Sequence, residues 1–454
     1  MRPLLALLLA PLALFADGQK FSVDYPISSL PSGFGFPTTY NLWVPEGVKT
    51  IRGVIVHQHG CGEGSNKSAV TAADDLHWQA LARKWNCALL GPVIRQPEAA
   101  NCREWCDPRN GSERVFLKAL DDLAQRSGHP ELASAPWCLW GHSGGGFWSS
   151  ILQAKHPERI VAIWFRSGTA YSAWQKTEDP KLVGQVPFVE LPPAAFEIPM
   201  MANPGAKENG DKRFNGAWTG TLAMFKAYRA KGAPIGFAPD PLTSHQCGDQ
   251  RYAALAFFDA CLGLRLSESG NTLRKIDQSK AWLAPLLGDV AGPAADYKGN
   301  AAEANWLPNA AFAKAWTEYV KTGATSDTTP PDAPFSVATK ATATGVEVTW
   351  DAHADLESGL VLGAAGRQGV DAGVVRFGGG NQIIRLVRRC PVEQGLTCLL
   401  ECRLELRGYI LVGSYRFRWC FRCPRIDTRV SSKEGVERRG KRVFKCDGVT
   451  EGHQ

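Results

Sequence analysis

After residue 15 the sequence lacks any apolar run long enough to cross a bilayer, which would take about 20 mostly apolar residues. The one long apolar run, residues 4–15, follows a single basic residue, Arg2, and precedes the small residue Ala16. This pattern is typical of a secretory signal peptide, so residues 1–16 are expected to be removed. The mature chain is therefore expected to be secreted or periplasmic, without a transmembrane segment.

The sequence also lacks metal ligands at the spacing of a zinc site. His57 and His59 alternate, but no acidic or sulfur-containing residue stands at a zinc-like interval from them. Near the C-terminus, Cys420 and Cys423 form one C-x-x-C pair, and no second pair matches it. We therefore expect neither a resident metal ion nor a cofactor.

The most informative feature that is present is a glycine-flanked serine. Residues 140–146 read W-G-H-S-G-G-G, a G-x-S-x-G pattern centred on Ser143. The apolar residues 136–140 before it predict a buried strand, and residues 145–156 have helical apolar spacing that stops at Pro157. Gly141 and Gly145 suit a sharp strand-to-helix turn, which would expose the serine oxygen. This context predicts a nucleophile rather than an ordinary helix N-cap serine.

A glycine-rich stretch follows an earlier predicted strand, residues 53–57, and reads H-Q-H-G-C-G over residues 57–62. A loop at the end of a strand can offer backbone N–H groups to a developing oxyanion. The stretch resembles the oxyanion loop of lipases and esterases. That resemblance implies backbone donors at Cys61 and Gly62, joined by Gly144, the residue after the nucleophile.

The order of the later elements selects a histidine. A predicted strand, a helix, a second strand, a loop and a final helix follow one another at residues 197–203, 218–231, 234–239, 243–248 and 250–262. This order resembles the last third of an α/β-hydrolase, which implies that His245 is the general base. His129 and His156 precede prolines at helix ends, and His77 lies within a helical stretch, so these three fit the role less well.

The acid of such a triad has three candidates. The loop of residues 204–211 offers Glu208 and Asp211, and Asp240 lies just before the histidine loop. Glu208 is preferred because it lies at the place of the G-x-K-D motif in proteins resembling dienelactone hydrolase. Asp211 is the second choice and Asp240 the third, since only geometry can decide which carboxylate reaches the imidazole.

The resemblance covers roughly residues 41–263 and implies the α/β-hydrolase fold, a mostly parallel sheet with helices on both faces. The expected strands are residues 40–44, 54–57, 87–93, 137–140, 159–165, 197–203 and 234–239. We expect the catalytic domain to span residues 17–322, with an alanine-rich helical extension at residues 267–321. A Pro/Thr-rich linker, residues 323–334, follows it.

Residues 335–360 resemble the start of a fibronectin type III module, with paired strands at residues 335–338 and 345–350 and a core tryptophan at Trp350. The resemblance then stops. Residues 361–454 hold 18 Lys and Arg against 9 Asp and Glu, together with six of the 13 cysteines. We expect this tail to be disordered or translated out of frame. A basic arm for an anionic surface and a cysteine-stapled small domain are the alternatives.

An exported chain can form disulfides, and at least two are expected among Cys61, Cys102, Cys106 and Cys247, holding the oxyanion loop and the histidine loop. Arg166, directly after a predicted strand, could bind an anionic group of the substrate or form a salt bridge to a loop carboxylate.

Together these features predict a secreted serine hydrolase that cleaves a small-molecule or carbohydrate-linked ester through an acyl-enzyme. A serine peptidase of the same fold and a binding protein that has lost its chemistry are the two alternatives. We expect no nucleic-acid partner.

Overall fold

A computed structural model describes residues 18–28, 34–68, 72, 74–171, 190–268 and 272–326, together with short strands beyond residue 337. The predicted signal peptide, most of the predicted linker and Trp350 lie outside the described residues. Among the helices described, none combines the length and apolar character that spanning a bilayer requires.

The main sheet has eight strands in the order β1-β2-β4-β3-β5-β6-β7-β8. The strands are β1 (Gly18–Tyr25), β2 (Thr38–Pro45), β3 (Gly53–Gln58), β4 (Cys87–Ile94), β5 (Trp137–His142), β6 (Ile160–Arg166), β7 (Met200–Asn203) and β8 (Ile235–Phe237). Strand β2 runs antiparallel to both β1 and β4, and all the other pairs are parallel. The predicted α/β-hydrolase sheet is therefore confirmed.

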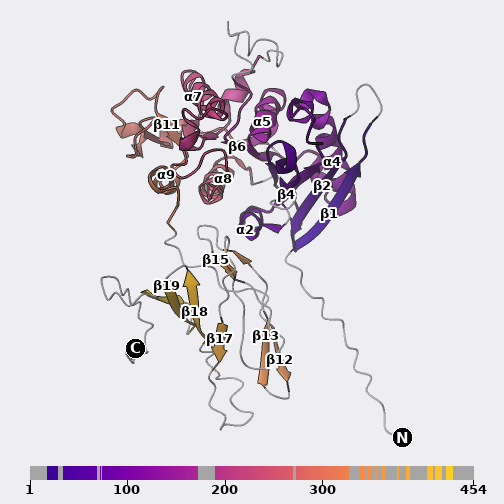
Figure 1. The fold of residues 1–454 in the computed structure, drawn as a ribbon, viewed down its shortest axis with the longest axis vertical. Coiled ribbons are helices and arrows are strands. Elements are labelled where there is room, and N and C mark those ends of the chain that lie inside the picture. Colours follow the sequence, from indigo (N-terminus) through magenta and orange to yellow (C-terminus); the bar gives the residue numbers. More distant parts are fainter. Residues whose placement is uncertain are drawn as a thin grey trace.

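Helices cover both faces of this sheet (Figure 1). One face carries α4 (Ser112–Ser127), α5 (Gly144–Lys155) and α7 (Asn215–Arg229), and the other carries α2 (Leu76–Trp85), α8 (Arg251–Arg265) and α9 (Ala310–Thr322). Because side chains alternate along a strand, Val54 and Val56 of β3 join the first core and Ile55 joins the second. Burial on both faces explains the continuous apolar runs that predicted the central strands.

Two sheet predictions need correction. The strand expected at residues 197–203 begins at Met200, because Pro193–Glu197 form a 3₁₀ turn and Pro199 lacks an N–H to donate. Strand β1 was not predicted. It is an edge strand in which only Val23 is fully buried, so its sequence, GQKFSVDY, gives little apolar signal.

The extension predicted to be helical over residues 267–321 is wrong for most of its length. Among the described residues of this extension, which omit 269–271, only α9, at its end, is an α-helix. Before it lie the short strands β9 (Trp282–Ala284), β10 (Gly292–Pro293) and β11 (Asn305–Leu307), which form a separate antiparallel sheet. Pro285 and Pro293 interrupt the alanine-rich sequence, and proline both removes a helical hydrogen bond and clashes with the preceding turn.

Beyond residue 337 the structure describes strands only. In the predicted fibronectin type III segment, β12 (Ala338–Thr342) pairs antiparallel with β13 (Gly345–Thr349). The second predicted strand is therefore present up to Thr349, while residues 335–337 of the first lie outside the described residues and its last residue, Ala338, begins β12. In the basic tail, β17 (Arg385–Arg388), β18 (Leu406–Val412), β19 (Tyr415–Phe421) and β20 (Ile426–Ser432) form a four-stranded sheet. These strands differ from the disorder expected there.

Candidate active site

Ser143 sits in the sharp turn between β5 and α5. Its backbone has φ 53° and ψ −116°, a strained conformation for a residue with a side chain. The turn requires glycine on both sides. A Cβ on Gly141 would lie 2.4 Å from the Gly145 carbonyl oxygen, and a Cβ on Gly145 would lie 1.8 Å from the Gln58 carbonyl oxygen. The predicted elbow is therefore present, and a side chain at either glycine position would clash with the backbone.

Ser143, His245 and Glu208 form one chain of hydrogen bonds. His245 Nε2 lies 2.9 Å from Ser143 Oγ, and His245 Nδ1 lies 2.6 Å from Glu208 Oε1. Glu208 is fully buried, and its second oxygen, Oε2, accepts the Gly205 N–H at 3.1 Å. Both carboxylate oxygens are thus fixed by partners. The arrangement orients the imidazole so that Nε2 faces the serine hydroxyl.

The two alternative carboxylates have other partners. Asp211 is half-buried, and its Oδ1 accepts the backbone N–H groups of Arg213 and Phe214 at 2.8 Å each. These hydrogen bonds hold the pKa of Asp211 below its usual value. Asp240 is buried, accepts the Leu242 N–H at 2.9 Å and is paired with an arginine. Of the three candidates, only Glu208 contacts His245.

The predicted oxyanion loop lies against the nucleophile. A Cβ on Gly60 would be 3.0 Å from Ser143 Cβ. Within the described part of the chain, the N–H groups of Cys61 and Gly144 donate to no protein acceptor. The Gly62 N–H, in contrast, donates to Gln96 Oε1 at 3.1 Å. The prediction that Gly62 is an oxyanion donor is therefore wrong for this conformation, because its N–H already donates to the side-chain amide of Gln96.

One disulfide, Cys61–Cys102, fixes the oxyanion loop. A Cβ on Gly144 would lie 2.4 Å from Cys61 Sγ and 2.9 Å from Cys102 Sγ, so the bridge packs directly on the residue after the nucleophile. The expectation of at least two bridges is wrong for the described residues. Cys106 and Cys247 are both free, and no disulfide reaches the histidine loop.

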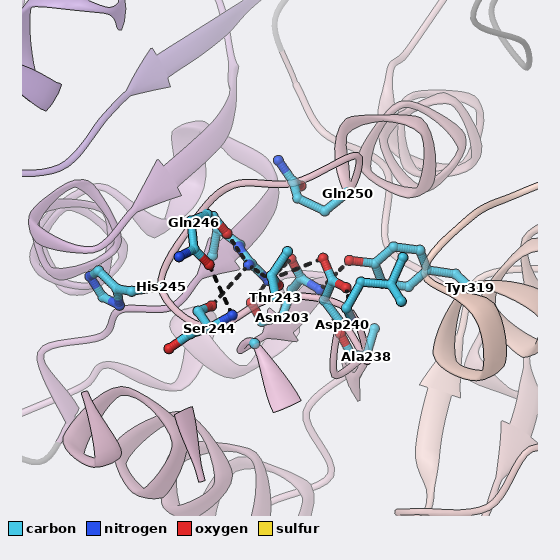
Figure 2. Close-up of polar contacts among 12 residues, drawn as sticks. Asn203, Ala238, Asp240, Thr243, Ser244, His245, Gln246, Gln250 and Tyr319 are labelled. Atoms are coloured by element: carbon cyan, nitrogen blue, oxygen red, sulfur yellow. Dashed lines mark hydrogen bonds and ion pairs between the residues drawn. The ribbon is translucent and has the colours of Figure 1, made fainter. Parts of the chain in front are cut away.

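The histidine loop is held instead by Arg166, which is fully buried at the end of β6. Its Nη1 donates to the backbone and side-chain oxygens of Asn203, both at 3.2 Å. Its Nη2 donates to Thr243 Oγ1 at 2.7 Å, to the Ser244 carbonyl at 3.3 Å and to the Gln246 carbonyl. Figure 2 shows these loop residues gathered around the network, with His245 pointing away from it.

This burial decides between the two predictions for Arg166. A fully buried guanidinium cannot meet a substrate, so the predicted anion-binding role is wrong. The salt-bridge alternative is confirmed, because Arg166 Nη1 lies 3.9 Å from Asp240 Oδ2. The acidic partner balances the charge, and the five polar contacts above involve Nη1 and Nη2, whereas the buried Nε has no hydrogen-bond partner. Arg166 thus connects the ends of β6 and β7 to the loop that carries His245.

Two neighbours of His245 were not predicted. Phe214 stacks on its imidazole with ring centroids 4.1 Å apart and planes 7° apart. His142 Nε2 lies 2.8 Å from the His245 carbonyl oxygen, so this nitrogen carries a proton and donates it. Burial, followed by the nearby His245 and His59, lowers the pKa of His142 well below its usual value. Neither contact has a sequence signal, since each joins loops that only the fold brings together.

Three further histidines have partners outside the triad. His57 is fully buried against Trp78 and Trp140, and burial lowers its pKa to about 3. One ring nitrogen of His129 lies 3.0 Å from a carboxylate oxygen of Glu131, and one of His156 lies 2.7 Å from a carboxylate oxygen of Glu113. His245 is thus the histidine at the elbow, as its place in the chain order implied.

Comparisons with known proteins found no match to a protein-family model and no match among curated proteins. Among solved structures, an S-formylglutathione hydrolase from Agrobacterium tumefaciens is 14% identical with a TM-score of 0.34, over 51% of this chain and 89% of that chain. A ferulic acid esterase is 14% identical with a TM-score of 0.37, over 54% and 97%. A dienelactone hydrolase from Anabaena variabilis is 16% identical with a TM-score of 0.29, over 51% and 89%. At this level of likeness, function has to be argued from the geometry of the site.

Proposed function

We propose that this chain is a secreted serine hydrolase that cleaves carboxylic esters. The observation that carries the proposal is the hydrogen-bonded series Ser143–His245–Glu208 at a strained elbow. A serine hydroxyl needs an adjacent base to become a nucleophile, and the base needs an oriented, charged partner. The backbone N–H groups of Cys61 and Gly144, beside the elbow, can donate hydrogen bonds to a negatively charged oxygen.

In the proposed reaction, Ser143 Oγ attacks the ester carbonyl carbon while His245 Nε2 takes the hydroxyl proton. Glu208 stabilises the resulting imidazolium through Nδ1–H. The carbonyl oxygen becomes an oxyanion, which the N–H groups of Cys61 and Gly144 stabilise. The C–O bond to the alcohol then breaks, and His245 gives its proton to the leaving oxygen.

The acyl-enzyme is hydrolysed by the same groups. His245 takes a proton from water, the hydroxide oxygen attacks the acyl carbon, and the bond to Ser143 Oγ breaks. The proton then returns to the serine, which restores the starting state. Secretion is supported by the N-terminal sequence pattern and by the Cys61–Cys102 bridge, since disulfides persist in oxidising compartments.

Turnover of matched substrates tests the reaction class. A p-nitrophenyl ester and a p-nitroanilide that share one acyl group differ only in the leaving group. We expect the purified chain to hydrolyse the ester and to leave the anilide essentially uncleaved. Cleavage of the anilide or of peptides at comparable kcat/KM would assign the peptidase alternative instead, and turnover of neither would favour a binding protein.

Replacing Arg166 with lysine is expected to lower kcat by about 10²-fold with little change in KM. Lysine keeps the positive charge but cannot span the acceptors on β7 and on the histidine loop. The loop would then hold His245 less accurately, and a displacement of about 1 Å costs catalysis about this much. Steady-state kinetics on a p-nitrophenyl ester, with circular dichroism to check the fold, measures the effect.

The matched control is Arg265→Lys. Arg265 is also a buried arginine that donates to backbone carbonyls, those of Glu197 and Ile160 at 3.1 and 3.2 Å, but it contacts no residue of the site. Both variants should lose stability, and only Arg166→Lys should lose kcat. Equal kinetic effects in the two variants would reduce Arg166 to a general stabilising residue.

A further inference from the structure

Three side chains that the proposed reaction does not use converge beside the triad. His59 follows β3, His142 ends β5, and Cys247 lies in the histidine loop after β8. One ring nitrogen of each histidine and the Cys247 sulfur all lie within 4.8 Å of one another. Two imidazoles and a thiol at this separation are a set of metal-binding donors.

The hydrogen bond made by His142 suits this role. Its Nε2–H donates to the His245 carbonyl oxygen at 2.8 Å, so the lone pair is left on Nδ1. A histidine that binds a metal commonly donates its other ring N–H to a backbone carbonyl or a carboxylate, which fixes the tautomer and the ring orientation. The supporting contact of a metal ligand is therefore already present at His142.

His59 and Cys247 are held by their surroundings. The backbone N–H of His59 donates to Ser68 Oγ at 2.8 Å, and the imidazole ring packs on Trp140 with ring centroids 4.7 Å apart. Cys247 is in no disulfide and is half-buried. A bound cation would displace the thiol proton, because thiolate is the ligating form.

We propose that His59, His142 and Cys247 form a binding site for a zinc-type transition-metal ion. Nitrogen and sulfur donors favour such an ion over magnesium or calcium, which prefer oxygen. With zinc–nitrogen and zinc–sulfur distances of about 2.0 and 2.3 Å, tetrahedral ligands lie roughly 3.3–3.7 Å apart. Side-chain movements that shift the donor atoms by about 1 Å would bring them to that spacing, and a water molecule would be the fourth ligand.

The three ligands belong to the three segments that carry the triad machinery. His59 begins the oxyanion loop, His142 precedes Ser143, and Cys247 follows His245 by two residues. A metal ion here would tie these segments together and stabilise the folded state through binding free energy. The inference goes beyond the proposed hydrolase activity and does not depend on it.

Metal content of the full-length chain tests the site. Chelator-treated protein is dialysed against micromolar Zn²⁺, and bound zinc is measured by atomic emission. Because the cysteine-rich tail can also bind zinc, the readout is a difference: Cys247→Ala and His59→Gln should each bind one equivalent less than the unmodified chain. Zinc should also raise the melting temperature of the unmodified chain and not that of Cys247→Ala.

Cobalt supplies a second readout and Cys106→Ala the control. Co²⁺ bound through Cys247 should give a thiolate-to-cobalt charge-transfer absorption in the near ultraviolet that disappears in Cys247→Ala. Cys106 is a free, buried cysteine outside the cluster, so Cys106→Ala should keep both the absorption and the zinc stoichiometry. Ser143→Ala should keep them too, which separates this proposal from the hydrolase proposal. Equal zinc content and equal absorption in the unmodified chain and Cys247→Ala would overturn the site.

Discussion

Replacing Ser143 with alanine is expected to lower kcat for a p-nitrophenyl ester by about 10⁶-fold, with KM little changed. The substitution removes the only atom that bonds covalently to the substrate and leaves the binding surface in place. Any residual rate would come from the oxyanion donors and from substrate binding alone. Steady-state kinetics with enough enzyme to detect the residual rate measures the loss.

Two further variants make this result specific. Ser127→Ala removes a hydroxyl that donates to the Leu123 carbonyl at 2.7 Å, at the end of α4, and should keep full activity. The double variant Ser143→Ala/His245→Ala should be no slower than Ser143→Ala, because residues that act as a unit lose their effect together. Full activity in Ser143→Ala would show that Ser143 is not the nucleophile.

Replacing Glu208 with glutamine is expected to lower kcat by roughly 10³- to 10⁴-fold. The Gly205 N–H donates to one carboxylate oxygen, so the glutamine carbonyl should turn toward it and the amide NH₂ toward His245 Nδ1. An NH₂ group there donates a hydrogen bond, which favours the tautomer with its proton on Nε2. That tautomer cannot accept the Ser143 proton. Steady-state kinetics on the same ester measures the effect.

Asp211→Asn is the matched control for the acid. Asp211 lies in the same loop, but it does not contact His245, and its side chain accepts hydrogen bonds from backbone N–H groups. Asparagine can accept similar hydrogen bonds, so kcat should change little. If Asp211→Asn instead lost as much activity as Glu208→Gln, the account of the acid would have to be changed.

The sequence predicted what depends on local pattern and chain order. The central strands are buried on both faces and read as apolar runs, and the elbow glycines are adjacent to the serine they serve. His245 and Glu208 follow successive strands, so their side chains were expected at one edge of the sheet. The structure places them there, in contact with each other and with Ser143.

The sequence failed where contacts join distant loops. Nothing in the sequence shows that Gln96 accepts a hydrogen bond from the Gly62 N–H, or that Arg166 is buried rather than exposed to substrate. The same holds for Cys247, which lies near two histidines from other segments. The strands β1 and β9 were not predicted for another reason. Neither sequence has the regular alternation of buried and exposed residues that indicates a strand.

Labelling with a fluorophosphonate tests the central claim most directly. This class of reagent bonds to a serine only when a neighbouring base activates it. Incubation of the full chain, followed by proteolysis and mass spectrometry, should show one phosphonyl adduct per chain, located on Ser143. Heat-unfolded protein and His245→Ala should remain unlabelled. Absence of an adduct on Ser143 in the folded chain, or an adduct that persists undiminished in His245→Ala, would contradict the account.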